Sequence, residues 1–168
     1  MLLFETAIGT CGVGWSDVGI TGVALPRERR LNGSALQGST DVPDRVRAAI
    51  DGMASLLRGQ SSDLRFVVLD ERGVEEFRRR VYAATREIGP GATATYGDIA
   101  RAIREPRAAQ AVGAALAQNP FPIIVPCHRV LAATGALHGF SAPGGIATKR
   151  RMLEIERAPG FTQEALFA

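Results

Sequence analysis

The sequence predicts a mixed α/β protein with two domains: a small domain of β-sheet and helix in residues 1–72, and a mostly helical domain in residues 73–168. Three observations support this prediction. Short apolar runs alternate with glycine-rich turns near the amino terminus, whereas apolar residues recur at helical spacing through much of the second half. The polar segment 70–73 between these regions has the composition of a linker.

The amino-terminal domain should begin with a small antiparallel meander. Its apolar stretches cover residues 2–6, 12–15 and 19–25. Glycine-rich turns separate them, as in hairpin-connected strands. Residues 32–40 are polar and should form a loop, and the apolar spacing of residues 43–57 predicts a helix capped near Thr40 or Asp41. Residues 64–69 are expected to add one more strand.

Helices are expected in the second half over residues 74–87, 95–103, 108–118 and 148–157. The first is amphipathic and ends at a glycine-proline sequence, residues 89–91. Thr95 and Asp98 form a variant of the capping box at the start of the second. A tight turn joins the two short middle helices, which predicts a helix-turn-helix. Residues 119–131 should form a strand or turn, and residues 135–145 a glycine-rich loop.

The adjacent residues Cys127 and His128 are the strongest chemical signal in the chain. A thiol is a useful nucleophile as the thiolate, and a nearby imidazole or cation lowers its pKa from about 8.5. Cys127 is followed by an imidazole and by the guanidinium of Arg129, within an apolar segment. Taken alone, each residue would suit a packed core as well. Together they predict a reactive centre in which His128 removes the thiol proton.

The residues around this pair resemble the O6-alkylguanine-DNA alkyltransferases, also called methylated-DNA–protein-cysteine methyltransferases. The motifs that carry the resemblance are Pro126-Cys127-His128-Arg129, Asn119-Pro120, Gly139-Phe140-Ser141, Lys149, Thr95-Tyr96-Gly97-Asp98-Ile99-Ala100 and Ala108-Ala109-Gln110-Ala111-Val112-Gly113. The match runs from about Val74 to Glu156, and residues 1–72 match the family's variable domain only loosely. It implies a ribonuclease H-like amino-terminal domain and a winged-helix-like helix-turn-helix.

The resemblance implies stoichiometric, irreversible alkyl transfer in DNA repair. Cys127 would take the alkyl group from O6-alkylguanine in DNA, with O4-alkylthymine as a further candidate substrate, and keep it as a thioether. Glu156 would orient His128 through a hydrogen bond, and Tyr96 would help the nucleotide rotate and donate to the leaving purine. Without the resemblance, the sequence would suggest that Glu156 is an ordinary surface residue of a helix and that Tyr96 is an aromatic residue of the core. No metal or organic cofactor is expected.

The resemblance also places the helix expected at 108–118 in the minor groove, where degenerate base edges suit lesion search in any sequence. The target base must be extruded, because a thiolate cannot align behind the alkyl carbon within the stack. The residues implied at substrate or DNA are Asn119, Arg107, Gln110, Ala111, Gly113, Arg129, Val130, Phe140 and Ser141. Asn119 would hold the reactive turn, whereas Val130 and Ser141 would read guanine through their backbones. Phe140 stands where many relatives have tyrosine.

Gln110 departs from the family pattern, because relatives usually carry an arginine there that replaces the flipped base in the stack. Glutamine is neutral and shorter, so we expect weaker intercalation. Arg107 lies one turn upstream, but residues three apart share a helix face only approximately.

The net charge of +3 is unevenly distributed: residues 73–168 carry 12 basic and 8 acidic side chains, against 8 and 9 in residues 1–72. A basic half suits a polyanionic partner, although 19 arginines beside one lysine are equally consistent with genome composition. We expect a monomer that binds double-stranded DNA containing alkylated guanine, with cooperative binding left open. No membrane partner is expected, since no apolar run nears the roughly 20 residues of a membrane span. The expected location is the cytoplasm, in association with the nucleoid. Cys11 and Cys127 lie far apart in the sequence and indicate neither a disulfide nor a zinc site.

Two other classes of function are compatible with parts of the sequence. An alkyltransferase-like module would bind lesions without transferring a group, but such proteins lack the reactive cysteine found here as Cys127. A thiol hydrolase with Cys, His and Glu is chemically feasible, but no residue pattern indicates an oxyanion hole or a cleft for a protein substrate.

Overall fold

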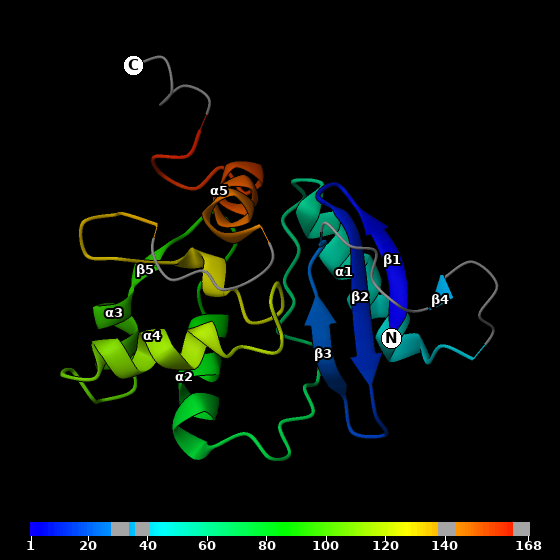
Figure 1. The fold of residues 1–168 in the computed structure, drawn as a ribbon, viewed down its shortest axis with the longest axis horizontal. Helices are drawn as coiled ribbons and strands as arrows, with labels where there is room; N and C mark the ends of the chain where they lie inside the picture. Colours follow the sequence, from blue (N-terminus) through cyan, green and yellow to red (C-terminus); the bar gives the residue numbers. More distant parts are fainter. Residues whose placement is uncertain (28–33, 36–40, 138–143, 163–168) are drawn as a thin grey trace.

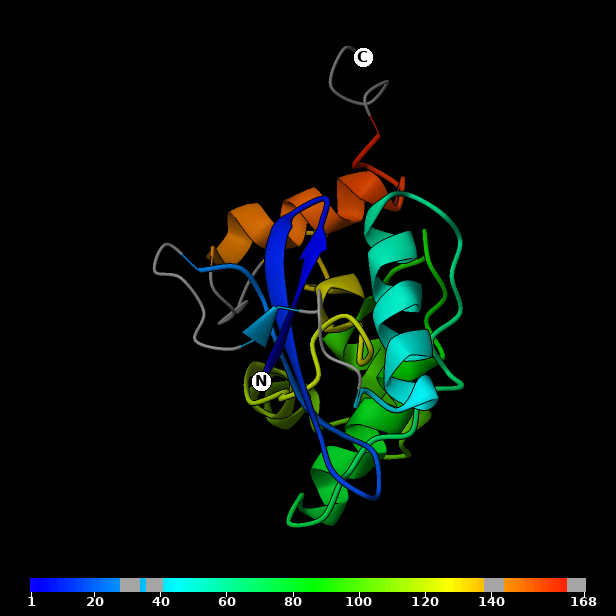
Figure 2. The same cartoon turned by 90° about the vertical axis from the view of Figure 1, so that its right-hand side faces the viewer.

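The computed structural model describes residues 1–27, 34–35, 41–137 and 144–162. Figure 1 shows a sheet backed by the helix α1 (Asp44–Leu57) on one side of the molecule. The helices α2 (Glu76–Arg86), α3 (Tyr96–Ala102) and α4 (Ala109–Ala117) lie together on the other side. In Figure 2, α5 (Gly145–Ile155), drawn in orange, runs across the upper part of the molecule. No helix within the described ranges is long and apolar enough to cross a membrane.

The predicted antiparallel meander is confirmed. The strands are β1 (Leu2–Thr6), β2 (Gly9–Trp15), β3 (Ile20–Ala24) and β4 (Ser34–Ala35), in the sheet order β3-β2-β1-β4. The first three are antiparallel, and β4 pairs parallel to β1. Phe4 lies opposite Cys11 and Leu2 opposite Val13, which places four buried apolar side chains at paired positions. This apolar face is the amino-terminal part of the core.

Helix α1 (Asp44–Leu57) packs its apolar stripe into the core through Val46, Ile50 and Met53. The predicted cap at Asp41 was wrong, and Thr40 lies outside the described residues. Pro43 occupies the N-cap position without a side-chain bond, and its carbonyl accepts hydrogen bonds from the first turn. The fixed φ of proline thus leads the chain into the helix without a polar cap.

The strand predicted at residues 64–69 was wrong. Only Leu69 forms an isolated parallel bridge, to Ile20. The Asp63 carboxylate accepts the Arg65 backbone N–H at 2.9 Å, and this local bond turns the chain away from a ladder. Phe66, in this turn, is 56% exposed, whereas Leu64 and Val67 are buried.

The segment predicted as a linker is attached to the sheet. Asp70 donates its N–H to the Ile20 carbonyl at 2.7 Å and accepts a bond from the Ser16 hydroxyl at 2.7 Å. Arg72 closes the cluster with an ion pair to Asp70 at 2.6 Å. One hydrophobic cluster contains residues from both sides of this segment, for example Val13 and Cys127. The domain boundary at residues 72 and 73 stays a prediction.

The second half contains α2 (Glu76–Arg86), α3 (Tyr96–Ala102), α4 (Ala109–Ala117) and α5 (Gly145–Ile155), with short parallel strands β5 (Ala94–Thr95) and β6 (Val130–Leu131). The predicted helix-turn-helix is confirmed as α3 and α4. The capping box is present too: Thr95 Oγ1 accepts the Asp98 N–H at 3.0 Å, and Asp98 Oδ2 accepts the Thr95 N–H at 2.8 Å. This cap sets where α3 begins.

Replacing Thr95 by alanine should lower the free energy of unfolding by about 1 kcal/mol, because the Asp98 N–H loses its acceptor. Thr95→Ser keeps the oxygen and should stay close to wild type. Urea titrations followed by far-UV circular dichroism would measure both values. Equal stability of the alanine and serine variants would show that the cap contributes nothing.

Candidate active site

The segment that carries Cys127 is a tight, buried turn. Asn119 fastens it at both ends: its Nδ2 donates to the Val125 carbonyl at 3.0 Å, and its Oδ1 accepts the Phe121 N–H at 2.9 Å. Ile123 adopts a φ of 75°, which is rare for a β-branched residue. The chain then enters a single 3₁₀ turn, Cys127–Arg129. Of the predicted alternatives, strand or turn, the structure has the turn, and the position of Asn119 agrees with its expected role.

The structure brings His128 and Glu156 together, as the resemblance implied. His128 Nε2 lies 2.8 Å from Glu156 Oε1, and the two side chains are 1% and 3% exposed. Since the carboxylate only accepts, we assign the proton to Nε2. Nδ1 then carries the lone pair, and it has no hydrogen-bond partner among the described residues. A neutral imidazole held in this tautomer can act as a base.

Arg129 is buried, and its side chain is engaged inside the protein. Its Nε donates to Glu156 Oε2 at 2.9 Å and its Nη2 to Oε1 at 2.8 Å, while Nη1 donates to the Ile88 carbonyl at 2.6 Å. This bidentate fork holds the carboxylate in a fixed plane. Arg129 was expected from the sequence to contact DNA. That expectation is revised, because its guanidinium is 6% exposed and all three of its nitrogens donate to groups inside the protein.

Burial and hydrogen bonds set the protonation states in opposite ways. Burial raises the pKa of Cys127, and the Asn119 side chain, the Lys149 charge and local backbone N–H groups lower it in part. Burial lowers the pKa of His128 despite its bond to Glu156. Burial alone would raise the pKa of Glu156, but hydrogen bonds from His128 and Arg129 bring it down to about 2. At neutral pH this is a neutral thiol beside a neutral imidazole and a carboxylate, and removal of the thiol proton by His128 stays a prediction.

Lys149 is a site residue to which the sequence motifs assigned no role. It lies on α5, is 1% exposed, and donates from Nζ to the Val130 carbonyl at 2.7 Å. Nζ also lies 5.9 Å from the centre of the Tyr96 ring. A positive charge here favours thiolate at Cys127. The signal was present in the composition, because this is the single lysine beside 19 arginines.

Tyr96 is the first residue of α3, and it faces α4 across the helix-turn-helix. A Cβ built on Gly113 would meet the Tyr96 ring at 3.8 Å, so the ring lies against the α4 backbone. Burial raises the pKa of Tyr96, and a negative charge on Cys127 raises it further. The phenol is therefore protonated at neutral pH and can donate.

The outer surface of α4 presents small and neutral side chains. Gln110 and Ala111 are exposed on its first turn, and Arg107 is exposed in the turn before it. Val130 is buried in β6, and its carbonyl accepts a hydrogen bond from Lys149 Nζ. Phe140 and Ser141 lie outside the described residues.

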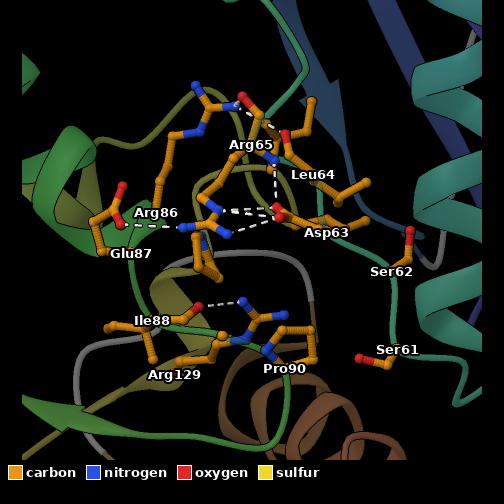
Figure 3. A pocket seen from close by; sticks show the side chains of 14 residues that line it. Ser61, Ser62, Asp63, Leu64, Arg65, Arg86, Glu87, Ile88, Pro90 and Arg129 are labelled. Carbon is orange, nitrogen blue, oxygen red and sulfur yellow. Dashed lines mark hydrogen bonds and ion pairs between the residues drawn. The ribbon is translucent and has the colours of Figure 1, made fainter.

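A pocket of about 190 Å³ lies behind the reactive turn, where loop 61–65 meets the end of α2 and residues 123–126. Figure 3 shows that its arginines are already engaged: Arg65 contacts Asp63 and Glu87, and Arg129 contacts the Ile88 carbonyl. Neither Cys127 nor His128 lines it. This pocket is a polar seam between the two parts of the chain, separate from the thiol. In the described part of the chain, no group of three or more His, Cys, Asp or Glu could hold a metal ion.

Comparison with known proteins agrees with this arrangement. Residues 76–158 match the family model for the 6-O-methylguanine DNA methyltransferase DNA binding domain. A methylated-DNA–protein-cysteine methyltransferase from Methanothermobacter thermautotrophicus is 36% identical over 147 residues, covering 86% of this chain and 78% of the relative. The protein of the same name from Mycobacterium tuberculosis is 41% identical over 128 residues, covering 76% and 75%.

Solved structures resemble the whole chain. The crystal structure of Mycobacterium tuberculosis OGT in complex with DNA superposes with a TM-score of 0.75 at 35% identity, covering 99% of this chain and 98% of that one. A structure of the O6-methylguanine methyltransferase from the same organism gives 0.76 at 33% identity, with the same coverage. The predicted fold class, a ribonuclease H-like domain followed by a helical domain with a helix-turn-helix, is confirmed.

Replacing Glu156 by glutamine should lower the free energy of unfolding by about 3 kcal/mol at pH 7, because Arg129 would be left as a buried, unpaired cation. The carboxyl titrates near its ordinary pKa of 4.5 when unfolded and near 2 when folded. Its contribution is therefore complete above about pH 5 and is lost as the pH falls from 4.5 to 2.

Urea titrations of wild type and variant between pH 2 and 7 would measure this difference. Glu154→Gln, on the same helix and without an ion pair to any described residue, should behave as wild type. A constant difference between wild type and Glu156→Gln at every pH would contradict the assignment.

Proposed function

This chain belongs to the 6-O-methylguanine DNA methyltransferase family, and on that premise we propose that it repairs DNA by moving the alkyl group of O6-alkylguanine onto Cys127. The observation that carries the proposal is a single nucleophile in a rigid turn, beside a buried imidazole whose tautomer is held by Glu156. A methylated-DNA–protein-cysteine methyltransferase needs a thiol that reacts once, with a base to remove its proton.

The proposed reaction starts from the neutral thiol. His128 Nδ1 has no direct hydrogen bond to Cys127, so we propose that a solvent molecule passes the thiol proton to it, and Glu156 stabilises the resulting imidazolium. Burial lowers the pKa of Lys149, and in its charged form this side chain favours the thiolate electrostatically. Sulfur then bonds to the alkyl carbon while the bond from that carbon to O6 breaks, and the electron pair stays on the purine, which takes a proton or hydrogen bond from Tyr96. The thioether has no easy leaving group, so each molecule reacts once, without a metal or organic cofactor.

A resting neutral thiol has a chemical advantage in a protein that reacts once. A thiolate exposed in free protein would be consumed by other electrophiles and oxidants. Here Cys127 is 8% exposed and its pKa is raised by burial. We infer that Cys127 loses its proton when an extruded base, which has left the base stack, lies against the thiol.

The helix-turn-helix supports the DNA-binding part of the proposal. We propose that α4 enters the minor groove, since exposed Ala111 and the glycine at Gly113 allow close approach of its backbone. Arg107 and Gln110 would lie at the same groove, and Val130, Phe140 and Ser141 would contact the base. The partner is double-stranded DNA with alkylated guanine, bound by a monomer. We place the protein in the cytoplasm with the nucleoid, where its substrate is.

Mass spectrometry after mixing with O6-methylguanine DNA tests the function directly. We expect one methyl group on Cys127 in the wild-type protein and none in Cys127→Ala. Cys11→Ser is the matched control, because Cys11 is buried and its pKa is raised by burial to about 11. Lesion binding without a mass change would favour a non-transferring module, and methylation of Cys127→Ala would remove Cys127 as acceptor.

Gln110→Arg should tighten DNA binding and steepen its salt dependence by about one unit of slope, because the variant adds a charge that contacts phosphate. It should also speed repair of duplex DNA more than reaction with a free alkylated base, since only the duplex requires the gap of an extruded base to be filled. Single-turnover rate constants on both substrates decide the matter. A duplex rate equal to or slower than that of wild type would show that another residue stabilises the flipped base. Arg107 would then be the first candidate to test.

A further inference from the structure

Tyr82 and Arg78 on α2 hold the carboxyl end of α4. The Tyr82 hydroxyl donates to the Ala115 carbonyl at 2.8 Å and accepts from Arg78 Nε at 3.2 Å. Arg78 Nη2 donates in turn to the carbonyl of Gln118, the C-cap residue of α4, at 2.9 Å. Two of the carbonyls at this helix end are thereby satisfied from α2, and a cation sits where the helix dipole favours one.

The same tyrosine also contacts the reactive turn. Its ring meets the edge of Phe121 with centroids 6.4 Å apart and planes at 86°. Phe121 belongs to that turn: its N–H donates to Asn119 and its carbonyl accepts from Val125 at 2.8 Å. Tyr82 is completely buried, so its ring and hydroxyl are both confined. One side chain therefore contacts the candidate DNA-binding helix at one end and the Cys127 turn along its ring.

We propose that Tyr82, with Arg78, is a positioning residue that sets the place of α4 relative to the Cys127 thiol. The inference rests on the proposed function, since it concerns transfer from duplex DNA. In that reaction α4 holds the DNA while the thiol must meet the extruded base, and small displacements of reacting groups slow a reaction strongly. A free alkylated base binds near the thiol without α4, so its reaction does not depend on this spacing.

The sharpest test is Tyr82→Phe, which removes the hydroxyl and keeps the ring against Phe121. Single-turnover rate constants would be measured on duplex O6-methylguanine DNA and on free O6-benzylguanine. We expect the duplex rate to fall about tenfold, the size of one lost hydrogen bond between α2 and α4, and the free-base rate to change less than twofold. An equal fall on both substrates, or no fall on either, would overturn the proposal.

Thr85→Val is the matched control, because it removes another fully buried hydroxyl of α2 that bonds within its own helix, to the Val81 carbonyl at 2.7 Å. It should leave the ratio of the two rates unchanged, whatever it does to the melting temperature. A ratio changed as much as in Tyr82→Phe would show a general loss of packing and overturn the proposal. Absence of transfer by the wild-type protein on both substrates would instead reject the proposed function.

Arg78→Met supplies a second, independent check. If Arg78 acts through Tyr82 and the end of α4, the double variant should lose little more duplex activity than either single variant. Tyr82→Phe should also leave the salt dependence of DNA binding unchanged. A reduced salt slope in Arg78→Met would show that Arg78 contacts phosphate, and additive losses in the double variant would show that it acts independently of Tyr82. Either result would overturn the positioning role of Arg78.

Discussion

The buried Glu156 carboxylate is the interaction on which the site depends. It ends α5, receives the Arg129 fork on one side and His128 on the other, and Arg129 continues to the Ile88 carbonyl after α2. One anion therefore joins α5, the reactive turn and the end of α2. Charges taken out of water are tolerated only when they are paired and hydrogen-bonded. For this reason the relay that orients the base is also part of the structure that holds the fold.

The same burial explains the chemistry of the thiol. A low-dielectric surrounding keeps Cys127 protonated and His128 neutral, whereas Lys149 and the turn's own N–H groups favour the thiolate. The opposing effects leave a nucleophile that is unreactive at rest and close to a base. Transfer from DNA then requires the extruded nucleobase to lie against the thiol, and its position depends on how α4 is held against the reactive turn. The contacts of Tyr82 with both elements provide that constraint.

Much of this protein follows from local sequence patterns. The adjacent Cys127 and His128 led to the hypothesis of a reactive centre, on what the structure shows to be a 3₁₀ turn. Alternating apolar runs and glycine turns predicted the meander, and the Thr95 capping box predicted where α3 begins. These features were predictable because each depends on residues a few positions apart. The strand predicted over Leu64–Leu69 was wrong because that prediction rested on apolar composition alone. The hydrogen bond from the Arg65 N–H to the Asp63 carboxylate turns the chain there.

Sequence alone established the family resemblance and the helix-turn-helix, and it led to the proposal that Cys127 is the nucleophile. Tertiary structure decided what surrounds them: that Arg129 is buried on Glu156, that Lys149 reaches the Val130 carbonyl, and that Tyr82 joins α4 to the reactive turn. These contacts link residues far apart along the chain, and their energies depend on burial. A guanidinium in water is available to phosphate, whereas the same group inside the protein must pair with a carboxylate. Burial is a property of the packed chain, which local patterns do not contain.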